Sequence, residues 1–478
     1  MTTLHFPVER TAAAPLHRQV YEGVRSRILA GVLKPGQRLP STRALAQDLA
    51  VSRQPVLAAY EQLLHEGYLE GRSGAGTYVC RALPDDLLAS ESRMPSPRGE
   101  RRRRPKHFAT DVGRLMPFRI GIPALEHFPH ALWARLVARH ARHSTPADMV
   151  YGDPAGLPAL RAAIAAHLRA ARGVDCEPDQ VLVVSGSQAG LRLVAAVLLE
   201  RGARVAIEEP GYFGARMAFD AHGAVLAHVP VDREGLRVDA LRELVGGARA
   251  VYVTPSHQYP LGTTMSAARR LALLDWAREH DAWVLEDDYD SAFRYASRPL
   301  GALQGMRESA RVIYIGTFSK TLFPALRVGY VVVPPELVPA FAEARVAFDV
   351  FSPTLYQKVL AEFLEEGHFE RHLRRMRTVY KARRDALLDG LARFTGGRLE
   401  PVNADAGLQL TALLTAGEAD RPLVRRLKEK NVTAVRLSAC YYGGGPPQYG
   451  LLLGFSGSAE PELLAATRVL GEVLRASP

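Results

Sequence analysis

The chain has 478 residues, of which 47% are hydrophobic, and it carries a formal net charge of +11. Because this length exceeds what one ordinary hydrophobic core accommodates, two or three domains are expected. No run of about 18 apolar residues occurs, which argues against a helical membrane span, and the start, MTTLHFPVER, lacks the charged-then-apolar pattern of a signal peptide.

The positive charge is concentrated at one end of the chain. Residues 1–110 hold 17 Lys/Arg against 10 Asp/Glu. A concentrated positive end favours a polyanionic partner such as DNA, although an arginine-rich composition that reflects a GC-rich genome would give the same excess. The cysteines Cys80, Cys176 and Cys440 are widely spaced and form no metal or disulfide framework, which predicts a reducing cytoplasm.

Residues 1–80 are predicted to form a DNA-binding domain. Apolar residues recur at helical spacing over 15–31. Ser41 and Ser52 are placed to cap two further helices, which a short turn separates as in a helix-turn-helix. The following segment, GYLEGRSGAGTYV, predicts two short strands around a glycine-rich tip, the wing of a winged helix-turn-helix.

Residues 81–110 differ in composition from both neighbouring regions and are predicted to be a flexible basic linker. They contain four prolines and the run RRRRPK, Arg101–Lys106. This run either contacts DNA phosphates without sequence preference or forms a solvated tether, and the sequence leaves both readings open.

Residues 111–478 are predicted to form one effector domain of the α/β class. Short runs rich in Val and Ile end in polar loops and alternate with helical stretches such as 191–199 and 267–279. This alternation predicts a mainly parallel sheet with helices on both faces, and ligands of such sheets bind beyond the carboxyl ends of the strands. After about residue 345, helix-rich sequence leads into a smaller C-terminal α/β subdomain.

Two of these polar loops hold the groups that pyridoxal 5'-phosphate (PLP) requires. In GTFSKTLFPALRVGY, Lys320 follows a strand and is predicted to form a Schiff base with PLP, and Arg327 is predicted to bind the phosphate. In LEDDYDSAF, Asp287 is predicted to pair with the pyridinium nitrogen, with Asp288 as the nearby alternative. Tyr289 is predicted to hydrogen-bond the phenolic oxygen of the ring.

Further cofactor contacts are predicted in three other segments. SGSQAGLRL lies between a strand and a helix, so that Ser187 and Gln188 at the helix N-terminus can bind a phosphate. Tyr212, in EEPGYFG, can stack on the ring. Tyr151, in YGDPAGLPALR, starts a polar turn before a helix and can also reach a phosphate.

The motifs together carry a family resemblance. YGDPAGLPALR, SGSQAG, EEPGY, TPSHQYPLG, EDDYDSAF and GTFSKTLFPALRVGY occur in the order seen in fold-type I, class I aminotransferases, and this similarity covers roughly residues 115–475. The N-terminal part resembles the GntR-type winged helix-turn-helix. With the linker between them, the two parts resemble the MocR family of PLP-dependent transcriptional regulators.

The resemblance implies roles for further residues. Tyr151 resembles the tyrosine that reaches the phosphate of the partner subunit, which implies a homodimer. Arg43 and Arg53 match basic residues at the starts of the second and third helices, where arginines can read guanine edges. Arg72 matches a wing residue that contacts the DNA backbone or minor groove. Gln54 stands where relatives often carry asparagine, which implies a different base preference.

The chain departs from the aminotransferase pattern in two places. Tyr259 precedes Pro260 where aminotransferases usually carry asparagine, and His257 is expected to take over the cofactor contact that this asparagine makes in them. The segment LLLGFSG, residues 451–457, has leucines where aminotransferases carry an arginine for the substrate carboxylate, which argues against ordinary transamination. Arg436 either anchors an effector carboxylate instead or is a surface charge at a strand edge.

These features predict a cytoplasmic, dimeric, DNA-binding transcriptional regulator rather than an enzyme, nucleoid-associated when bound to DNA. Its aminotransferase-like domain is expected to bind PLP and to sense a small amine, an amino acid or PLP itself, with residual half-transamination left open. The alternative is an active aminotransferase that carries a DNA-binding module. A third reading, a DNA-binding protein with a vestigial cofactor site, is disfavoured by the intact set of Lys320 and Arg327.

Overall fold

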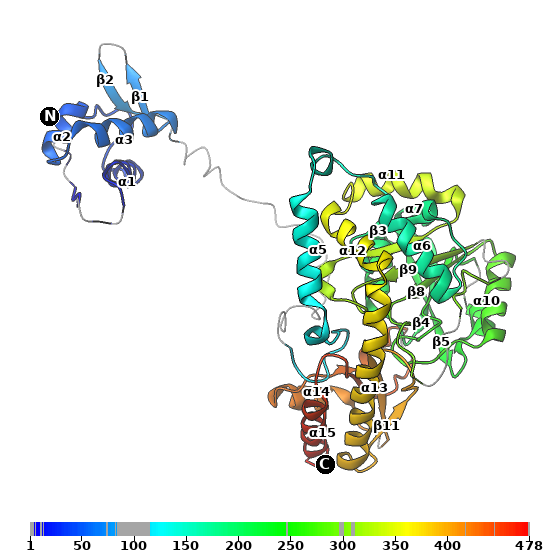
Figure 1. Cartoon of the computed structure of the whole chain (residues 1–478). Coiled ribbons are helices and arrows are strands. Elements are labelled where there is room, and N and C mark those ends of the chain that lie inside the picture. The colour runs from blue at the N-terminus through cyan, green and yellow to red at the C-terminus, as the bar shows by residue number, and fades with distance from the viewer. Residues whose placement is uncertain are drawn as a thin grey trace. The chain divides into compact units, whose positions relative to one another are not determined.

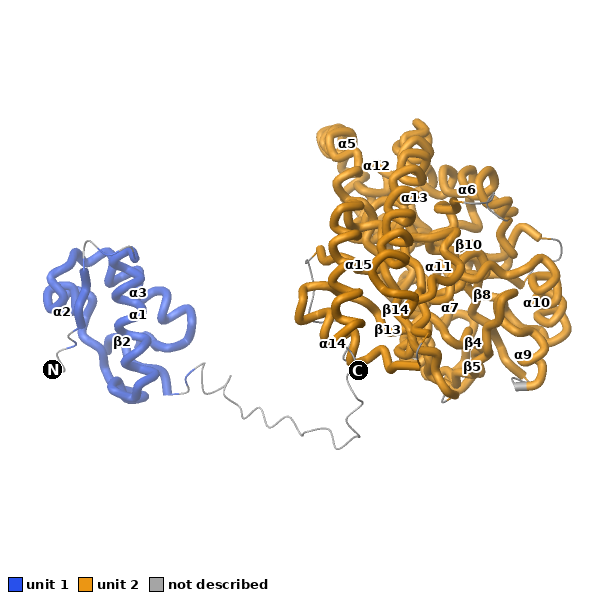
Figure 2. Tube along the Cα trace, turned by 90° about the horizontal axis from the view of Figure 1, so that it is seen from below, with its two compact units in different colours: residues 1–110 blue, residues 111–478 orange. Residues whose placement is uncertain are grey.

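The structure is a computed structural model of the whole chain (Figure 1). It describes residues 14–72, 75–81, 115–244, 247–295, 301–306, 311–415, 417–443 and 445–476, together with residues 4, 6–9, 12 and 83. The chain divides into two compact units, residues 1–110 and 111–478 (Figure 2). The predicted linker contacts of Arg101–Lys106 lie outside the described residues.

Within the described residues of the first unit lie three helices and a hairpin. The helices are α1 (Leu16–Leu29), α2 (Thr42–Asp48) and α3 (Arg53–His65), and the antiparallel strands are β1 (Leu69–Arg72) and β2 (Gly76–Val79). Buried apolar residues of all three helices form one core with the hairpin, so the segment has the predicted winged helix-turn-helix arrangement.

Of the two serines that were expected to cap α2 and α3, one makes a capping hydrogen bond and the other does not. The Oγ of Ser41 accepts a hydrogen bond from the backbone N–H of Ala44 at 3.2 Å. Ser52 occupies the N-cap position of α3, but its side chain makes no capping hydrogen bond. The expected cap at Ser52 is therefore wrong in its side-chain contact, although the helix begins at the expected residue.

The second unit is built on an eight-stranded sheet in the order β3-β10-β9-β8-β7-β4-β5-β6. The five adjacent strands β9, β8, β7, β4 and β5 are parallel to one another. β10 is antiparallel to both of its neighbours, and β6 is antiparallel to β5. The bounds are β3 (Val181–Val184), β4 (Arg204–Glu209), β5 (Val225–Asp232), β6 (Gly235–Leu236), β7 (Ala250–Val253), β8 (Trp283–Asp288), β9 (Val312–Thr317) and β10 (Gly329–Val332).

Helices cover both faces of this sheet. One core cluster includes residues of α7 (Ser187–Leu198), α8 (Phe213–His222) and α11 (Val338–Phe348). A second includes α5 (His130–Arg142), α6 (Pro158–Arg172), α12 (Thr354–Glu365) and α13 (His368–Phe394), and a third includes α9 (Val238–Leu244) and α10 (Ala267–Glu279). Along β10, Tyr330 packs in the second cluster and Val331 in the first, as the two-residue period of a strand requires.

A smaller α/β subdomain follows. Its antiparallel sheet has the order β11-β12-β14-β13, with bounds β11 (Leu399–Val402), β12 (Gln409–Leu414), β13 (Val435–Arg436) and β14 (Gly450–Gly454). The helices α14 (Asp420–Glu429) and α15 (Glu460–Arg475) belong to it, and the long α13 runs from beside α12 to this subdomain (Figure 1). Short 3-10 helices span Leu125–His127, Pro146–Met149, Pro178–Gln180, Pro324–Leu326, Pro335–Leu337 and Leu437–Cys440.

The predicted fold class is confirmed, with a mainly parallel sheet and a second, smaller sheet. Among the helices that the structure describes, none combines the length and the apolar character that a bilayer crossing needs.

The core of the first unit can be tested at two neighbouring leucines of α3. Leu63 is fully buried, whereas Leu64 is 38% exposed. We expect Leu63→Ala to lower the free energy of unfolding of the first unit by about 2–5 kcal/mol, because it leaves a cavity, and Leu64→Ala to change it by less than about 1 kcal/mol. Calorimetry of the full chain measures both units; equal effects of the two variants, or a shift of the second unit's transition, would contradict this prediction.

Candidate functional site

The predicted cofactor residues lie at one edge of the large sheet. Ser187 and Gln188 follow β3, Tyr212 follows β4, and His257 follows β7. Asp287 and Tyr289 lie at the end of β8, and Lys320 follows β9. These strands run in the same direction, so their carboxyl ends, and the loops that carry these side chains, meet at one edge.

Asp287 is a buried acid with one oxygen free. The hydroxyl of Tyr252, on β7, donates to its Oδ2 at 2.7 Å, and its Oδ1 is buried without a hydrogen-bond partner. Burial, with smaller contributions from the charges of Asp288 and Asp290, raises the pKa of Asp287 to about 7, although the Tyr252 hydrogen bond opposes this. The unpaired oxygen leaves Asp287 able to pair with a cationic N–H group, whose charge would favour the ionised carboxylate.

Asp288 is already neutralised by the protein. Its Oδ2 accepts hydrogen bonds from Arg172 Nε at 2.8 Å and from the Tyr314 hydroxyl at 2.6 Å. Burial raises the pKa of Asp288, but attraction to Arg172 and the hydrogen bonds outweigh it and hold the pKa below its usual range. Of the two adjacent acids, only Asp287 therefore has an unused oxygen.

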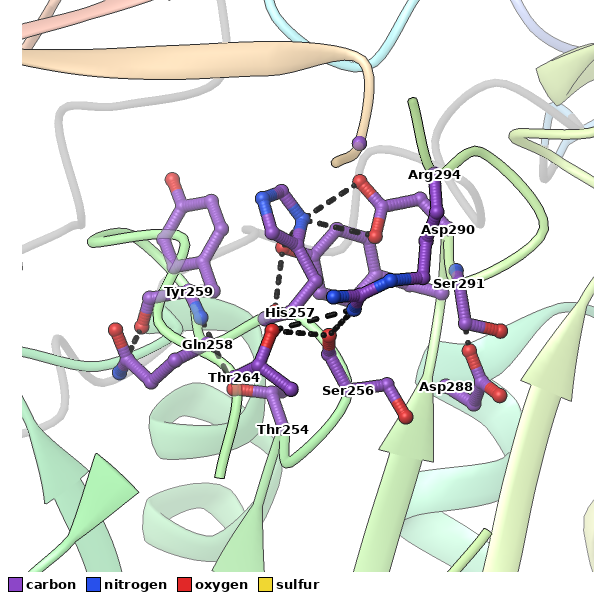
Figure 3. A network of polar contacts seen from close by, with 12 residues as sticks. Thr254, Ser256, His257, Gln258, Tyr259, Thr264, Asp288, Asp290, Ser291 and Arg294 are labelled. Atoms are coloured by element: carbon purple, nitrogen blue, oxygen red, sulfur yellow. Dashed lines mark hydrogen bonds and ion pairs between the residues drawn. The ribbon is translucent and has the colours of Figure 1, made fainter. Parts of the chain in front are cut away.

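Tyr289 and His257 form a hydrogen-bonded group with Asp290. The Nδ1 of His257 lies 2.9 Å from an Asp290 oxygen (Figure 3), and the Tyr289 hydroxyl donates to the His257 carbonyl at 3.0 Å. Gly407, from the smaller subdomain, lies over this group with a φ of +79°, and a Cβ there would overlap His257. His257 thus holds Tyr289 in place, and Asp290 orients the imidazole ring.

Lys320 is half-buried. Its Nζ donates to the carbonyl of Gly121 at 3.1 Å. Burial lowers the pKa of the amine, against the charges of Asp290 and Asp287, and a lowered pKa increases the nucleophilic fraction of an amine. Gly121, at a φ of +75°, leaves no room for a Cβ beside the Nζ, and no sequence motif had indicated this residue.

The start of α7 forms an anion cradle with Arg327. Gly186, the N-cap, has a φ of +84°, and its missing side chain makes room for the guanidinium group, since a Cβ would lie 3.0 Å from Arg327 Nη1. Arg327 is exposed and donates to the carbonyl of Ser185. The first N–H groups of a helix have no partner within it and attract anions. Gln188 Nε2 is buried without a hydrogen-bond partner.

Tyr212 forms a wall of the site. Its ring makes an edge contact with Tyr259 at 5.3 Å between centroids. Burial, together with the charge of Asp287, raises the pKa of Tyr212 to about 12, so the hydroxyl stays neutral. Gly214 has no space for a Cβ between Tyr212 and Gln188.

Two predicted residues are not joined to this group. Tyr151 is 85% exposed, and its ring contacts Phe351 at 6.1 Å between centroids. Arg436 is half-buried on β13, the edge strand of the smaller sheet. Among the described residues, its side chain has no recorded hydrogen bond or ion pair.

The predicted DNA-contact residues are exposed on the first unit. Arg43 is on α2, and Arg53 and Gln54 begin α3, where Arg53 Nε donates to Thr42 Oγ1 at 3.1 Å. Arg72, at the end of β1, pairs with Glu70 at 2.6 Å and lies over the ring of Tyr78. The wing arginine is thus held by its own hairpin, whereas Gln54 and Arg43 project from helices.

The residues at the sheet edge fit PLP on three observations of this structure. The unpaired Asp287 Oδ1 suits a pyridinium N–H, and Lys320 suits an aldehyde. The start of α7 with Arg327 suits a phosphate. His257, which is expected to take over the contact that asparagine makes in aminotransferases, is hydrogen-bonded to Asp290 and Tyr289.

Two family models match the chain. The one described as "Aminotransferase class I and II" covers residues 115–449, and the one described as "Bacterial regulatory proteins, gntR family" covers residues 16–79. The chain is 43% identical to the probable rhizopine catabolism regulatory protein MocR of Rhizobium meliloti, over 94% of this chain and 92% of that protein. It is 33% identical to the pyridoxine biosynthesis transcriptional regulator PdxR of Corynebacterium glutamicum, over 93% of each.

Solved aminotransferase structures resemble the second unit. The α-aminoadipate aminotransferase LysN of Thermus thermophilus, complexed with N-(5'-phosphopyridoxyl)-L-leucine, gives a TM-score of 0.70 at 32% identity and covers 76% of this chain and 92% of its own. The kynurenine aminotransferase of Pyrococcus horikoshii, in complex with PMP, gives a TM-score of 0.70 at 27% identity. It covers 77% of this chain and 91% of its own.

The raised pKa of Asp287 predicts a pH dependence of stability. Burial holds the folded-state pKa near 7, against about 4 in the unfolded chain. Between these values only the folded state keeps the proton, so this residue's contribution to the free energy of unfolding falls as the pH rises from about 4 to about 7. We expect Asp287→Asn to reduce that fall in urea unfolding of the cofactor-free protein.

The control for this prediction is Asp179→Asn, whose carboxylate is 92% exposed and should leave the pH profile unchanged. An Asp287→Asn variant with the same pH profile as the original protein would contradict the prediction.

Proposed function

The chain belongs to the MocR family, in which a GntR-type helix-turn-helix precedes an aminotransferase-like domain, and on this premise we propose that it is a PLP-dependent, DNA-binding transcriptional regulator. Its second unit senses a small amine or amino acid, or PLP itself. The proposal rests on the presence of two features in one chain. One is a separate helix-turn-helix unit, and the other is the pair of Lys320 and Asp287, whose Oδ1 has no hydrogen-bond partner. It works in the cytoplasm, on the nucleoid when bound to DNA.

The substrate-binding side of the site favours a sensor over an enzyme. In β14, Leu451, Leu452 and Leu453 are fully buried where aminotransferases carry a carboxylate-binding arginine. Leu452 packs in a cluster with Tyr259 and Leu437. A buried apolar wall does not bind a carboxylate, so an amino-acid effector would need another cation, and Arg436 is the candidate for that contact.

The chain's own residues define how PLP would be held. When bound, PLP supplies an aldehyde that condenses with primary amines and a ring that withdraws electrons. Asp287 would keep a proton on the ring nitrogen, Tyr289 would donate to the phenolic oxygen, and Tyr212 would cover the ring. Ser187, Gln188 and Arg327 would hold the phosphate. The relative LysN, solved with a phosphopyridoxyl compound, supports this assignment.

Regulation follows from the position of Lys320. An effector amine that took the place of Lys320 on PLP would free the Nζ, for which the Gly121 carbonyl is a ready acceptor at 3.1 Å. Such an exchange changes DNA binding only if the effector binds one arrangement of the chain more tightly than another. By thermodynamic reciprocity, DNA must then change effector affinity by the same factor.

A cofactor-trapping experiment tests the proposal. We expect borohydride, added after PLP, to fix the cofactor on Lys320, because burial lowers the pKa of this amine and so increases its nucleophilic fraction. Peptide mass mapping would locate the label. Lys320→Ala should abolish it, and Lys358→Ala, which removes a lysine paired with Asp148, should not. Label on another lysine would overturn the assignment, and rapid multiple turnover with amino acids would favour the aminotransferase alternative.

The first unit would read DNA through the start of α3. We expect Arg53→Ala to weaken binding to the operator by about 1–3 kcal/mol, because it removes a base contact in the major groove, while PLP binding stays unchanged. Footprinting at physiological salt would measure this. The control is Arg18→Ala, which removes an exposed arginine of α1. Equal losses of operator affinity in both variants would indicate that Arg53 contributes only its charge and does not read a base.

We also infer a homodimer of the second unit. Met149, Val150 and Tyr151 are consecutive and 63–85% exposed, and Phe348 and Tyr356 add further exposed apolar surface. Exposed apolar residues of this kind mark interaction surfaces. Tyr151 of one subunit would reach the PLP phosphate of the other.

The dimer can be tested by sedimentation velocity. We expect Val150→Asp to raise the dimer dissociation constant at least about tenfold, because it buries an unpaired charge in the interface. Leu271→Asp places the same charge on α10, at a residue that is 50% exposed, and should leave the dimer intact. A wild-type chain that sediments as a monomer at micromolar concentration would rule the dimer out.

A further inference from the structure

A cavity adjoins the candidate cofactor site, between α6, α13 and the loops that follow β8 and β9. Its volume is about 670 Å³, within the range of small-molecule sites. Tyr289, Asp290 and Phe318 line it and also belong to the loops of the cofactor site. Neither Lys320 nor Asp287 lines it. The cavity is therefore a neighbour of the cofactor site and not a part of it.

The geometry of β8 explains why the two sites adjoin. Successive side chains of a strand point to opposite faces of the sheet. Asp287 is bonded to Tyr252, which packs in the core cluster of α7 and α8. Asp288 is bonded to Tyr314, which packs in the cluster of α6 and α13, and both line the cavity. The end of β8 thus has a cofactor side and a cavity side.

Charged side chains of both signs line the cavity. Its acids Asp288, Asp290 and Glu370 are occupied by Arg172, His257 and His167. On α13, Arg377 is half-buried and donates from Nε to the Ala292 carbonyl at 2.8 Å. Within the described part of the chain, neither Arg377 nor Arg374 has a recorded ion pair.

A bound anion would therefore pair with the two arginines of α13. Burial alone lowers the pKa of Arg377, with no carboxylate acting on it, so an anion bound there would satisfy a half-buried guanidinium group. Glu365, which is exposed at the end of α12, offsets one of the two arginines. A planar carboxylate matches the guanidinium group of Arg377 in a bidentate pair.

The inner wall is aromatic. The ring of Phe318 lies 5.5 Å from that of Tyr330 and 5.6 Å from that of Phe369, between centroids, and all three line the cavity. Across from them, α6 contributes alanines instead of larger side chains, and Ala166 and Ala170 are exposed toward this space. The small residues leave room for a flat ring against the aromatic wall.

We propose that this cavity is a second ligand site that binds a small aromatic monocarboxylate. The carboxylate would pair with Arg377 and Arg374, and the ring would lie against Phe318, Tyr330 and Phe369. A bound ligand would contact Tyr289 and Asp290 from the side opposite the cofactor, so its occupancy would alter the hydrogen-bonded group of His257. The site is distinct from that of the amine effector.

Phenylacetate is the probe, and calorimetry of the full-length protein is the measurement. We expect saturable binding of one molecule per chain, and binding at least about tenfold weaker for phenylacetamide, which lacks the charge. Arg377→Gln should weaken phenylacetate binding at least about tenfold because it removes the charge-assisted contact. Ala170→Phe should do the same by filling the space. Ala162→Phe, on the same helix but outside the cavity, should have no effect.

Lys320→Ala separates this proposal from the proposed function. Phenylacetate should bind this variant as tightly as it binds the original protein. This expectation holds whatever the trapping experiment on the original protein shows for Lys320. Unfolding temperatures of all variants show that each is folded. Absence of saturable binding, binding that survives both Arg377→Gln and Ala170→Phe, or binding lost in Lys320→Ala would each overturn the proposal.

Discussion

Two adjacent carboxylates at the end of β8 impose the main electrostatic constraint on this structure. Burying Asp287 and Asp288 side by side is unfavourable unless their charges are separated or neutralised. The strand turns them to opposite faces, and Arg172 neutralises Asp288 from the end of α6. Asp287 is left with a single hydrogen bond, from Tyr252. The candidate site depends on this asymmetry, because an acid that the protein has already satisfied could not hold a cofactor.

The same edge of the sheet is closed by a segment of the smaller subdomain. Asn403 Nδ2 donates to the Leu261 carbonyl and to Thr263 Oγ1, both at 3.0 Å. Gly407 lies against His257 and Asp290. The loops after β7 and β8 are therefore held from two sides, and a shift of the smaller subdomain would be transmitted to the Tyr289 hydroxyl. This is a physical route by which a bound ligand can change the shape of the unit.

A ligand that acts on transcription must connect that change to the helix-turn-helix unit. Each unit has its own core, as the clusters around Leu63 and Leu360 show, so neither needs the other in order to fold. The coupling then rests on the arrangements of the two units that a ligand stabilises, and its size is the difference in affinity for those arrangements. A second site beside the cofactor would add another ligand that can bias the same equilibrium.

Local sequence patterns determined much of the fold and of the candidate site. The alternation of Val/Ile-rich runs with helical stretches predicted the parallel sheet, since strand and helix periods are properties of neighbouring residues. The positions of Lys320 after a strand and of Asp287 at a strand end indicated cofactor chemistry for a similar reason, because parallel strands bring their carboxyl ends together. The capping contact expected of Ser52 failed because a serine before a helix fixes only the position and not the rotamer.

The contacts that distinguish Asp287 from Asp288 could not be predicted from local sequence patterns. Arg172 and Asp288 are 116 residues apart, and Lys320 and Gly121 are 199 apart. No periodicity or motif specifies such pairs, because they depend on how separate helices and strands pack. The cavity between α6 and α13 is of the same kind, since its lining combines alanines of α6 with the aromatic rings of Phe318, Tyr330 and Phe369, which lie far away in sequence. The sequence by itself determined the family, the fold class and the types of groups at the site; the tertiary structure alone decided which of those groups are neutralised by distant partners and which remain free to bind a ligand.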